Sequence, residues 1–142
     1  MNFAAHINTS TGLVEFISMS NSHHPYADGS THEGRLVKLV LETADAENKY
    51  WDGTQLVELP PIPGQFFEWT AYEWVLNTVA AEEWMRQERN HRLGRSDWTQ
   101  FNDSPLTAEQ QAAWATYRQQ LRDFPNGLVI TRIEDLSWPV EP

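Results

Sequence analysis

The sequence lacks cysteine, is poor in basic residues and has no long apolar run. No Cys among 142 residues excludes a disulfide scaffold, a thiolate nucleophile and a Cys-ligated metal. The 10 Lys and Arg against 20 Asp and Glu give a formal charge of -10, which repels nucleic acid. Every purely apolar run is far shorter than the roughly 18 residues of a membrane span. We therefore expect neither nucleic acid nor a membrane as partner.

Aromatic residues are abundant in this acidic chain, with 7 Trp and 12% aromatics overall. The length fits one compact domain or two very small modules. The opening MNFAAHINTSTG has no cationic segment followed by an apolar stretch. We therefore expect no secretory signal and a protein that matures in a cytoplasm.

Charge and periodicity divide the chain at one place. Residues 1–76 carry 10 acids and 3 bases, a net -7, whereas residues 77–142 carry 10 acids and 7 bases, a net -3. Apolar residues recur at short, strand-like spacings in the first half and at helical spacings in the second. The sequence predicts an α+β protein: a module of antiparallel β-hairpins over 1–76, then an antiparallel two-helix hairpin over 77–142.

The beginning of the chain predicts one hairpin and one central strand. Residues 3–7 and 13–17 are apolar and flank a polar turn that ends in Gly12. Residues 18–34 are rich in His, Ser, Asn and Gly and predict a loop. Residues 35–41, RLVKLVL, form the most strand-prone run of the sequence.

Two further hairpins are predicted on either side of a proline-rich spacer. Asp52-Gly53 separates 49–51 from 55–59 and is the pair expected in a type I′ turn, because both residue types tolerate positive φ. PPIPG at 60–64 cannot pair in a ladder and predicts an extended spacer. Residues 66–69 and 73–75 bracket Thr70-Ala71-Tyr72 as a third hairpin, so the two hairpins resemble a degenerate repeat.

Capping residues mark two helices in the second half. Asn77 or Thr78 can cap a helix over about 78–93, with Gly94 as its C′ residue. Thr107 and Gln110 form a capping box for a helix over 107–123. Pairs at i,i+4 link Glu82 to Arg86 and Glu88 to Arg92. After the second helix, residues 128–133 predict a short strand and 137–142 an extended tail.

An ordered set of motifs in the second half resembles a known family. The motifs are SDWTQ at 96–100, PLT at 105–107, W-x-x-Y-R-Q-x-L-R-D at 114–123 and WP at 138–139. Over roughly residues 80–142 the sequence resembles the tail assembly chaperone-like domain of tailed bacteriophages. It departs from the family at 129–135, where a proline-rich linker is common. Upstream, YWDG at 50–53, the proline spacer and the Trp69 to Val75 hairpin are similar to segments of phage tail-fibre and tail-fibre assembly proteins.

This resemblance implies a non-enzymatic protein of the virion tail, assembled in the host cytoplasm, that needs no cofactor. It would be a structural or adaptor component of the tail fibre or tail tip, in contact with other tail proteins. The alternative is a transient chaperone that leaves after fibre assembly. A carbohydrate-binding module that uses exposed Trp is a third possibility. No nucleophile elbow, zinc-protease motif or phosphate loop is present in the sequence, in agreement with a non-enzymatic role.

Five residues are candidates for partner binding in the helical half: Asp97, Trp98, Arg118, Arg122 and Trp138. Trp and Arg are enriched at interface hot spots, and Arg118 and Arg122 are four apart on a helix. The alternative is a solvated or internally paired arginine face. The arginines spaced by three from Arg86 to Arg95 drift around the helix and fit surface ion pairs. Trp114 and Leu121 are expected in the core, in an apolar seam with Tyr117 and Phe124.

A histidine-rich loop is the one place where a metal could bind. His23, His24 and His32 lie near Asp28 and Glu33, but their spacing matches no zinc motif. An ordinary solvated loop is the favoured interpretation, so we assign no metal ligand. If a metal binds, a trimer axis collecting His from several subunits is favoured over a site within one subunit. Because modules of roughly 60 to 75 residues are marginal alone, we expect a homo-oligomer, most simply a trimer.

Overall fold

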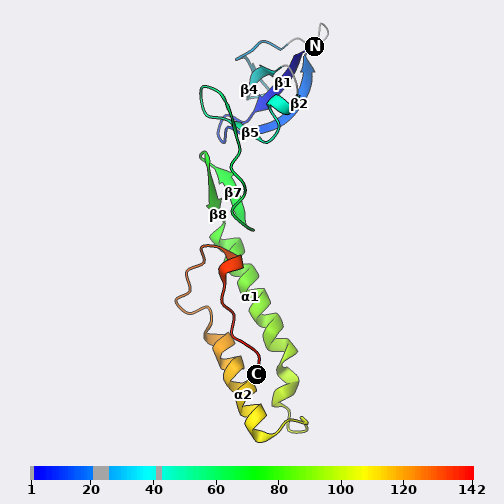
Figure 1. The fold of residues 1–142 in the computed structure, drawn as a ribbon, viewed down its shortest axis with the longest axis vertical. Coiled ribbons are helices and arrows are strands. Elements are labelled where there is room, and N and C mark those ends of the chain that lie inside the picture. The colour runs from blue at the N-terminus through cyan, green and yellow to red at the C-terminus, as the bar shows by residue number, and fades with distance from the viewer. Residues whose placement is uncertain (1, 21–25, 41–42) are drawn as a thin grey trace. The chain divides into compact units, whose positions relative to one another are not determined.

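A computed structural model describes residues 2–20, 26–40 and 43–142 of the chain. The chain divides into two compact units, described separately below. The first unit contains Met1–Ile62 and Glu68–Val75, and the second contains Pro63–Phe67 and Leu76–Pro142. Antiparallel sheets precede two helices along the chain (Figure 1), which confirms the predicted α+β class.

A four-stranded antiparallel sheet forms the centre of the first unit (Figure 1). Its strands lie in the order β2-β1-β4-β3, with bounds β1 Asn2–Ile7, β2 Val14–Ser20, β3 Thr31–His32 and β4 Arg35–Val40. The predicted first hairpin is confirmed as β1–β2. The predicted central strand is confirmed as β4, while Leu41 at its expected end lies outside the described residues.

The loop predicted over 18–34 is wrong at both of its ends. Ser18 to Ser20 prolong β2, because Asn2 at the start of β1 pairs with Ser20, and Thr31–His32 pair with β4. Backbone hydrogen bonds bring these polar residues into the ladder without any apolar pattern. His23 and His24 lie outside the described residues.

Small and β-branched residues, together with one histidine, fill the core of this sheet. Ala4, Ala5, His6 and Val37 have no exposed surface, and Ile7 has 1%. The register changes between His6, which pairs with Phe16, and Ile7, which pairs with Val14. Glu15 is therefore the extra residue of a β-bulge, a device that bends and twists a strand.

The hairpin of β5, Lys49–Trp51, and β6, Leu56–Glu58, is confirmed, but its turn is not type I′. Only Gly53 has positive φ, at 106°. The Asp52 carboxylate instead accepts hydrogen bonds from Thr54 N at 2.7 Å and Gln55 N at 2.9 Å. A four-residue loop held by the Asp side chain thus replaces the predicted two-residue turn.

A turn with two positive φ values occurs in the next hairpin, between β7, Phe67–Thr70, and β8, Glu73–Leu76. Ala71 has φ 48° and Tyr72 has φ 67°. The Tyr72 ring lies against Gly12, where an added Cβ would come within 2.6 Å of that ring and of the Trp51 carbonyl oxygen. Trp69 Nε1 donates to the Thr11 carbonyl at 3.0 Å. The aromatic hairpin is therefore packed on the first β-turn, which requires glycine at position 12.

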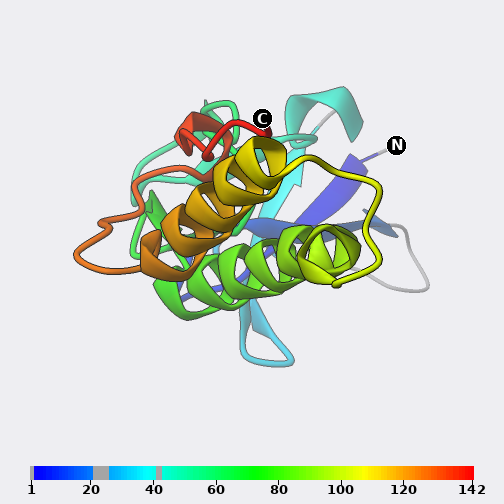
Figure 2. The ribbon, with the colours of Figure 1, turned by 90° about the horizontal axis from the view of Figure 1, so that it is seen from below.

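Two helices, α1 Thr78–Arg95 and α2 Ala108–Asp123, form the second unit. They run antiparallel and side by side in both views (Figures 1 and 2). The Asn77 side chain caps α1 by accepting from Ala80 N at 3.0 Å. The capping box of α2 is confirmed, with Thr107 N donating to Gln110 Oε1 at 2.9 Å and Gln110 N to Thr107 Oγ1 at 3.2 Å.

Two predictions about helix ends and strands in this unit are wrong. Gly94 is not a C′ residue, because α1 continues to Arg95 and the Ser96 hydroxyl donates to the Leu93 carbonyl at 2.9 Å. Residues 128–133 form no strand; Ile133–Asp135 instead form the 3-10 turn η3, in which Ile133 is buried. The Glu134 carboxylate accepts from Gln65 N at 2.8 Å, which fixes this turn within the unit. In the described part of the chain, no helix is long and apolar enough to cross a membrane.

Candidate functional site

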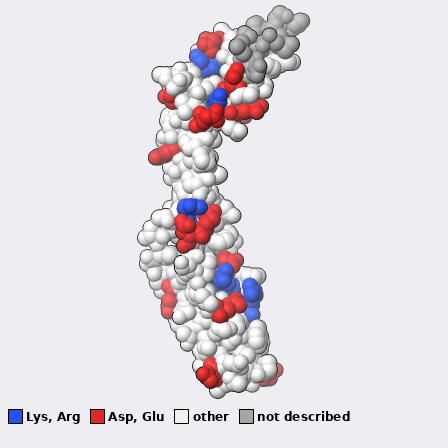
Figure 3. Space-filling view, in the orientation of Figure 1, with Lys and Arg blue, Asp and Glu red and all other residues white. Residues whose placement is uncertain are grey.

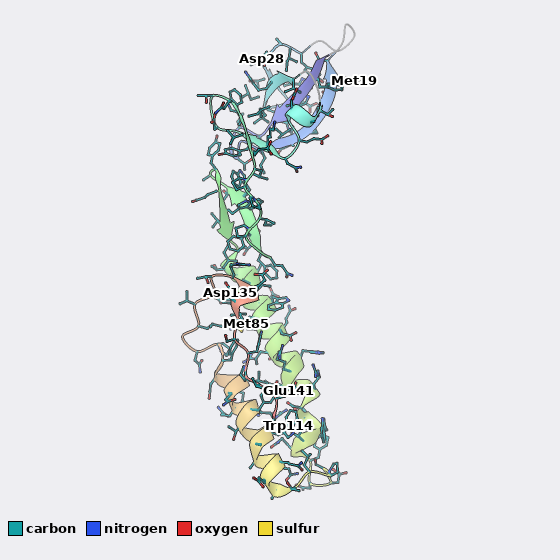
Figure 4. The ribbon with its side chains drawn as sticks, viewed as in Figure 1. Met19, Asp28, Met85, Trp114, Asp135 and Glu141 are labelled. Carbon is teal, nitrogen blue, oxygen red and sulfur yellow. The ribbon has the colours of Figure 1, made fainter. Side chains whose placement is uncertain are left out.

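The helical unit has a small core along the predicted seam. Tyr117 is 2% exposed and Leu121 has no exposed surface, which places them in the core together with Ala81 and Met85 of α1. Trp114 is half-buried and lies beside Tyr117, with the two rings perpendicular and 5.6 Å apart. Figure 4 shows Met85 and Trp114 in this helical part of the chain. The apolar seam is therefore confirmed, and Trp114 lies at its margin.

Arg118 connects the two helices. This α2 residue is only 9% exposed. Its guanidinium donates to the Leu93 carbonyl and to Ser96 Oγ, each at 2.7 Å, and to Asp97 Oδ1 at 2.6 Å. One cation thus satisfies the C-terminal end of α1 and holds the 3-10 turn η2, Asp97–Gln100, where carbonyl groups favour a positive charge.

The interhelix segment, residues 96–107, presents two aromatic side chains to solvent. Trp98 is 45% exposed and Phe101 is 58% exposed. The predicted partner residue Trp98 touches the helices through Trp114, with ring centroids 6.3 Å apart. Much of each ring is therefore uncovered. Phe101, which was not among the candidate site residues, therefore belongs with Trp98.

Several hydrogen bonds fix this segment on the helices. Thr99 is fully buried and its hydroxyl donates to the Ser96 carbonyl at 2.7 Å. Gln111 Nε2 of α2 donates to the Phe101 carbonyl at 3.2 Å, and Gln100 Nε2 donates back to the Gln111 carbonyl at 3.4 Å. The exposed aromatics are thus carried on an anchored backbone, which lowers the conformational entropy lost on binding.

The C-terminal tail, residues 137–142, contains no helix or strand and lies on the helices. Trp138 stacks on Phe124 with centroids 4.5 Å apart, and the Arg92 guanidinium lies 4.7 Å from the centre of the Trp138 ring. Glu141, labelled in Figure 4, pairs with Arg95 at 3.5 Å. The predicted partner residue Trp138 therefore makes its observed contacts within its own chain.

Two further arginines form the i,i+4 pairs that the spacing predicts. Arg86 pairs with Glu82 at 3.2 Å and Arg92 with Glu88 at 3.0 Å. Arg122, the fifth predicted partner residue, is exposed and donates to Gln119 Oε1 at 3.3 Å. Arg118 and Arg122 therefore differ in environment although they are four residues apart.

The described part of the histidine-rich loop lies beside the first sheet. His32 and Tyr26 surround the buried His6, with ring centroids 5.7 Å and 5.0 Å from it. Burial, and then the charges of His32 and Arg35, lower the pKa of His6 from its ordinary 6.5. Among the described residues there is no group of three or more His, Cys, Asp or Glu side chains able to hold a metal. This cluster is an aromatic packing contact.

The arrangement in the helical unit is suited to protein recognition. Its exposed aromatic rings provide apolar area for the centre of an interface, and the neighbouring carboxylate of Asp97 provides a polar group for the rim. Asp97 keeps 57% of its side chain exposed while it pairs with Arg118, so its free oxygen can accept a further hydrogen bond. In the sequence, the pattern that indicates this surface is a pair of aromatic residues, Trp98 and Phe101, in an otherwise polar connector.

The helical unit is similar in sequence to a known protein family. The family model "Phage tail assembly chaperone protein" matches residues 82–142. This range includes most of α1, the interhelix segment, α2 and the C-terminal tail. Searches of curated proteins and of solved structures found no match. The resemblance predicted for the C-terminal part is confirmed: residues 82–142 are similar to phage tail assembly chaperone proteins, which indicates a role in phage tail assembly.

Proposed function

We propose that this protein is a non-enzymatic structural or adaptor component of a phage tail, held at the tail fibre or tail tip in the virion. Its interhelix segment contacts another tail protein through Trp98 and Phe101. The observation that carries the proposal is the exposure of these two aromatics, 45% and 58%, on a backbone anchored to both helices. The family match supports the tail as the setting.

Binding through this segment agrees with the chemistry of the surrounding residues. Burying a Trp or a Phe contributes most when the ring enters a pocket and its neighbours exclude water. Asp97 precedes Trp98 in the chain, and its ion pair with Arg118 supplies polar groups at the rim. Arg118 acts through Asp97 and the α1 carbonyls, so it is a positioning residue for this surface.

A transient assembly chaperone is the second candidate, favoured by the similarity of residues 82–142 to phage tail assembly chaperone proteins. Both candidates use the same surface and differ in whether the protein stays with the particle. Mass spectrometry of purified phage particles separates them. We expect the protein in the tail fraction at a constant ratio to the fibre protein. Detection in the lysate alone would favour the chaperone.

The surface itself is tested by capture of the purified tail fibre on the immobilised full-length protein. We expect Trp98→Ala and Phe101→Ala each to weaken fibre binding about thirtyfold, the loss of roughly 2 kcal/mol that marks a hot-spot residue. Val129→Ala is the matched control, since Val129 is 82% exposed in the same unit but outside the interhelix segment. Unchanged fibre binding by both aromatic variants would refute the proposed surface.

A further inference from the structure

The four-stranded sheet of the first unit has one long edge and one short edge. Strand β3 at one edge has 2 residues, whereas β2 at the other has 7. Tyr50 bridges to Leu13 just before β2 begins. From Val14 onward, no described strand pairs with the outer side of β2. Outward-facing N–H and C=O groups of an edge strand are a template for another strand.

A hollow lies along this edge. It has a volume of about 530 Å³ and is lined by Val14–Ile17 of β2 on one side and by residues from the 43–48 segment on the other. That segment contains the 3-10 turn η1, Thr43–Asp45. A groove between an edge strand and a short helical turn is the geometry in which extended peptides add to a sheet.

The edge has one feature that normally blocks strand addition, the β-bulge at Glu15, whose carboxylate pairs with Arg35. Other usual protections are missing, since β2 has 7 residues and contains no Pro and no Lys. Two of its apolar side chains are open to solvent, Phe16 with 42% and Met19 with 53% of its surface exposed. Figure 4 shows Met19 on this strand. Side chains of an added strand would pack on such residues as cross-strand neighbours.

Charge indicates what kind of strand fits. The unit has 10 acidic and 3 basic residues. Each base is already paired: Arg35 with Glu15, Lys38 with Asp28 at 3.0 Å and Lys49 with Glu58 at 3.6 Å. Exposed Glu47 lies on the wall of the groove opposite β2. Figure 3 shows several acidic side chains on the visible face of this β-rich part.

We propose that the outer edge of β2 binds an extended, basic segment of a partner protein by strand addition. Main-chain hydrogen bonds to β2 provide the affinity, and Lys or Arg side chains facing Glu47 provide the selectivity. A second copy of this chain fits less well, because it would bring another net charge of -7 to the same edge. This surface is separate from the interhelix segment.

The test uses the full-length protein labelled with ¹⁵N and an eight-residue peptide of alternating lysine and valine. We expect chemical-shift changes at Val14–Ile17 and in the 43–48 segment, and slower exchange of β2 amides. A peptide of alternating glutamate and valine should not bind. The lysine peptide with alternate amides N-methylated should also lose binding, because it cannot form the ladder.

Matched variants test the groove. Glu47→Lys reverses an exposed charge on its wall and should weaken the lysine peptide about threefold, as expected for one exposed charge pair. Glu73→Lys makes the same change on exposed β8 of the same unit, outside the groove, and should leave the affinity unchanged. Trp98→Ala should bind the peptide like the wild type. A failure of the strand-addition proposal can therefore be distinguished from a failure of the proposed binding surface on the interhelix segment.

Several results would overturn the proposal. These are no binding of the lysine peptide, equal binding of the acidic or N-methylated peptide, or shifts confined to residues outside the groove. Light scattering tests whether a second copy of this chain occupies the β2 edge. A dimer that is dissociated by Met19→Lys would show that the edge serves self-association instead. Binding of the lysine peptide at β2 without any change in the oligomeric state of the protein supports the proposal.

Discussion

At the scale of single residues, Arg118 shows how one side chain decides the local arrangement of a unit. It is almost fully buried, and it replaces water at the Leu93 carbonyl and Ser96 while pairing with Asp97. A charged donor that serves several acceptors is hard to replace, because its removal leaves those groups without partners.

We therefore expect Arg118→Ala to lower the free energy of unfolding by about 2 to 3 kcal/mol, the range for hydrogen bonds to charged groups. Arg122→Ala is the matched control on the same helix and should stay within about 0.5 kcal/mol, as exposed substitutions do. Urea denaturation followed by helix circular dichroism measures both. Equal effects of the two substitutions would contradict the assigned role of Arg118.

His6 gives the first unit a pH-dependent stability. Burial lowers the pKa of its imidazole below the ordinary 6.5, so the unfolded chain binds more protons when the pH falls below that value. Stability from this residue is complete above pH 6.5 and is lost as the pH falls toward the folded pKa. Four carboxyls also have lowered pKa values: Glu15, Asp28, Asp52 and Glu134. Their contribution to stability changes only below their ordinary pKa values of 3.8 to 4.5, so it does not affect the range between about pH 5.5 and 7.

The prediction is that urea unfolding of β1, followed by NMR, requires more urea at pH 7 than at pH 5.5. His6→Gln removes the titrating group while keeping a hydrogen-bonding side chain toward Ser18, whose Oγ lies 2.8 Å from His6 Nε2. In this variant the difference between the two pH values should shrink. An NMR titration of the His6 ring that gives a pKa above 6.5 would contradict the argument.

At the scale of elements, the two aromatic hairpins have different turns despite their similar patterns. Asp52 uses its side chain to close a four-residue loop, whereas Ala71 and Tyr72 adopt left-handed conformations without glycine. A non-glycine residue in that region costs roughly 1 to 2 kcal/mol. The contact of the Tyr72 ring with Gly12 offsets this cost within the unit.

Ala71→Asn should therefore stabilise the hairpin, because Asn tolerates positive φ better than Ala and is favoured at the first central position of a type I′ turn. We expect a gain of about 0.5 kcal/mol. Thr70→Asn, one residue earlier in β7 and also exposed, is the control and should give no gain. Thermal unfolding of both variants measures the difference, and a loss of stability in Ala71→Asn would disprove it.

At the scale of the whole molecule, we propose that the protein works as an oligomer, most simply a trimer on a tail fibre. Each unit has a small core, and small modules gain stability by association when no disulfide is available. The formal charge of -10 per chain opposes this association at long range.

Light scattering should therefore give a mass near three times 16.4 kDa, and the trimer fraction should rise between low salt and about 0.5 M salt as repulsion is screened. Dissociation on adding salt would instead indicate an interface held by ion pairs. A stable monomer at every salt concentration that also ignores the fibre would contradict the oligomer.

Local chemistry in the sequence determined most of the elements. The capping box at Thr107 fixes the start of α2 with its own side chains, and the i,i+4 pairs of α1 form as spaced. The alternating apolar runs predicted β1, β2 and β4. The motifs from SDWTQ to WP predicted the family that matches residues 82–142. These features depend on residues close in sequence, so they are readable without the fold.

Tertiary contacts decided the rest. Ser18 to Ser20 became strand because β1 offers a partner along its whole length, and residues 128–133 found no partner strand among the described residues. The left-handed turn at Ala71 and Tyr72 is packed on a residue distant in sequence, Gly12. Arg118 and Arg122 have the same chemistry and helical spacing, yet only Arg118 is buried against the end of α1. Residues far apart in sequence set these outcomes, and a single sequence does not encode those distances in any local pattern.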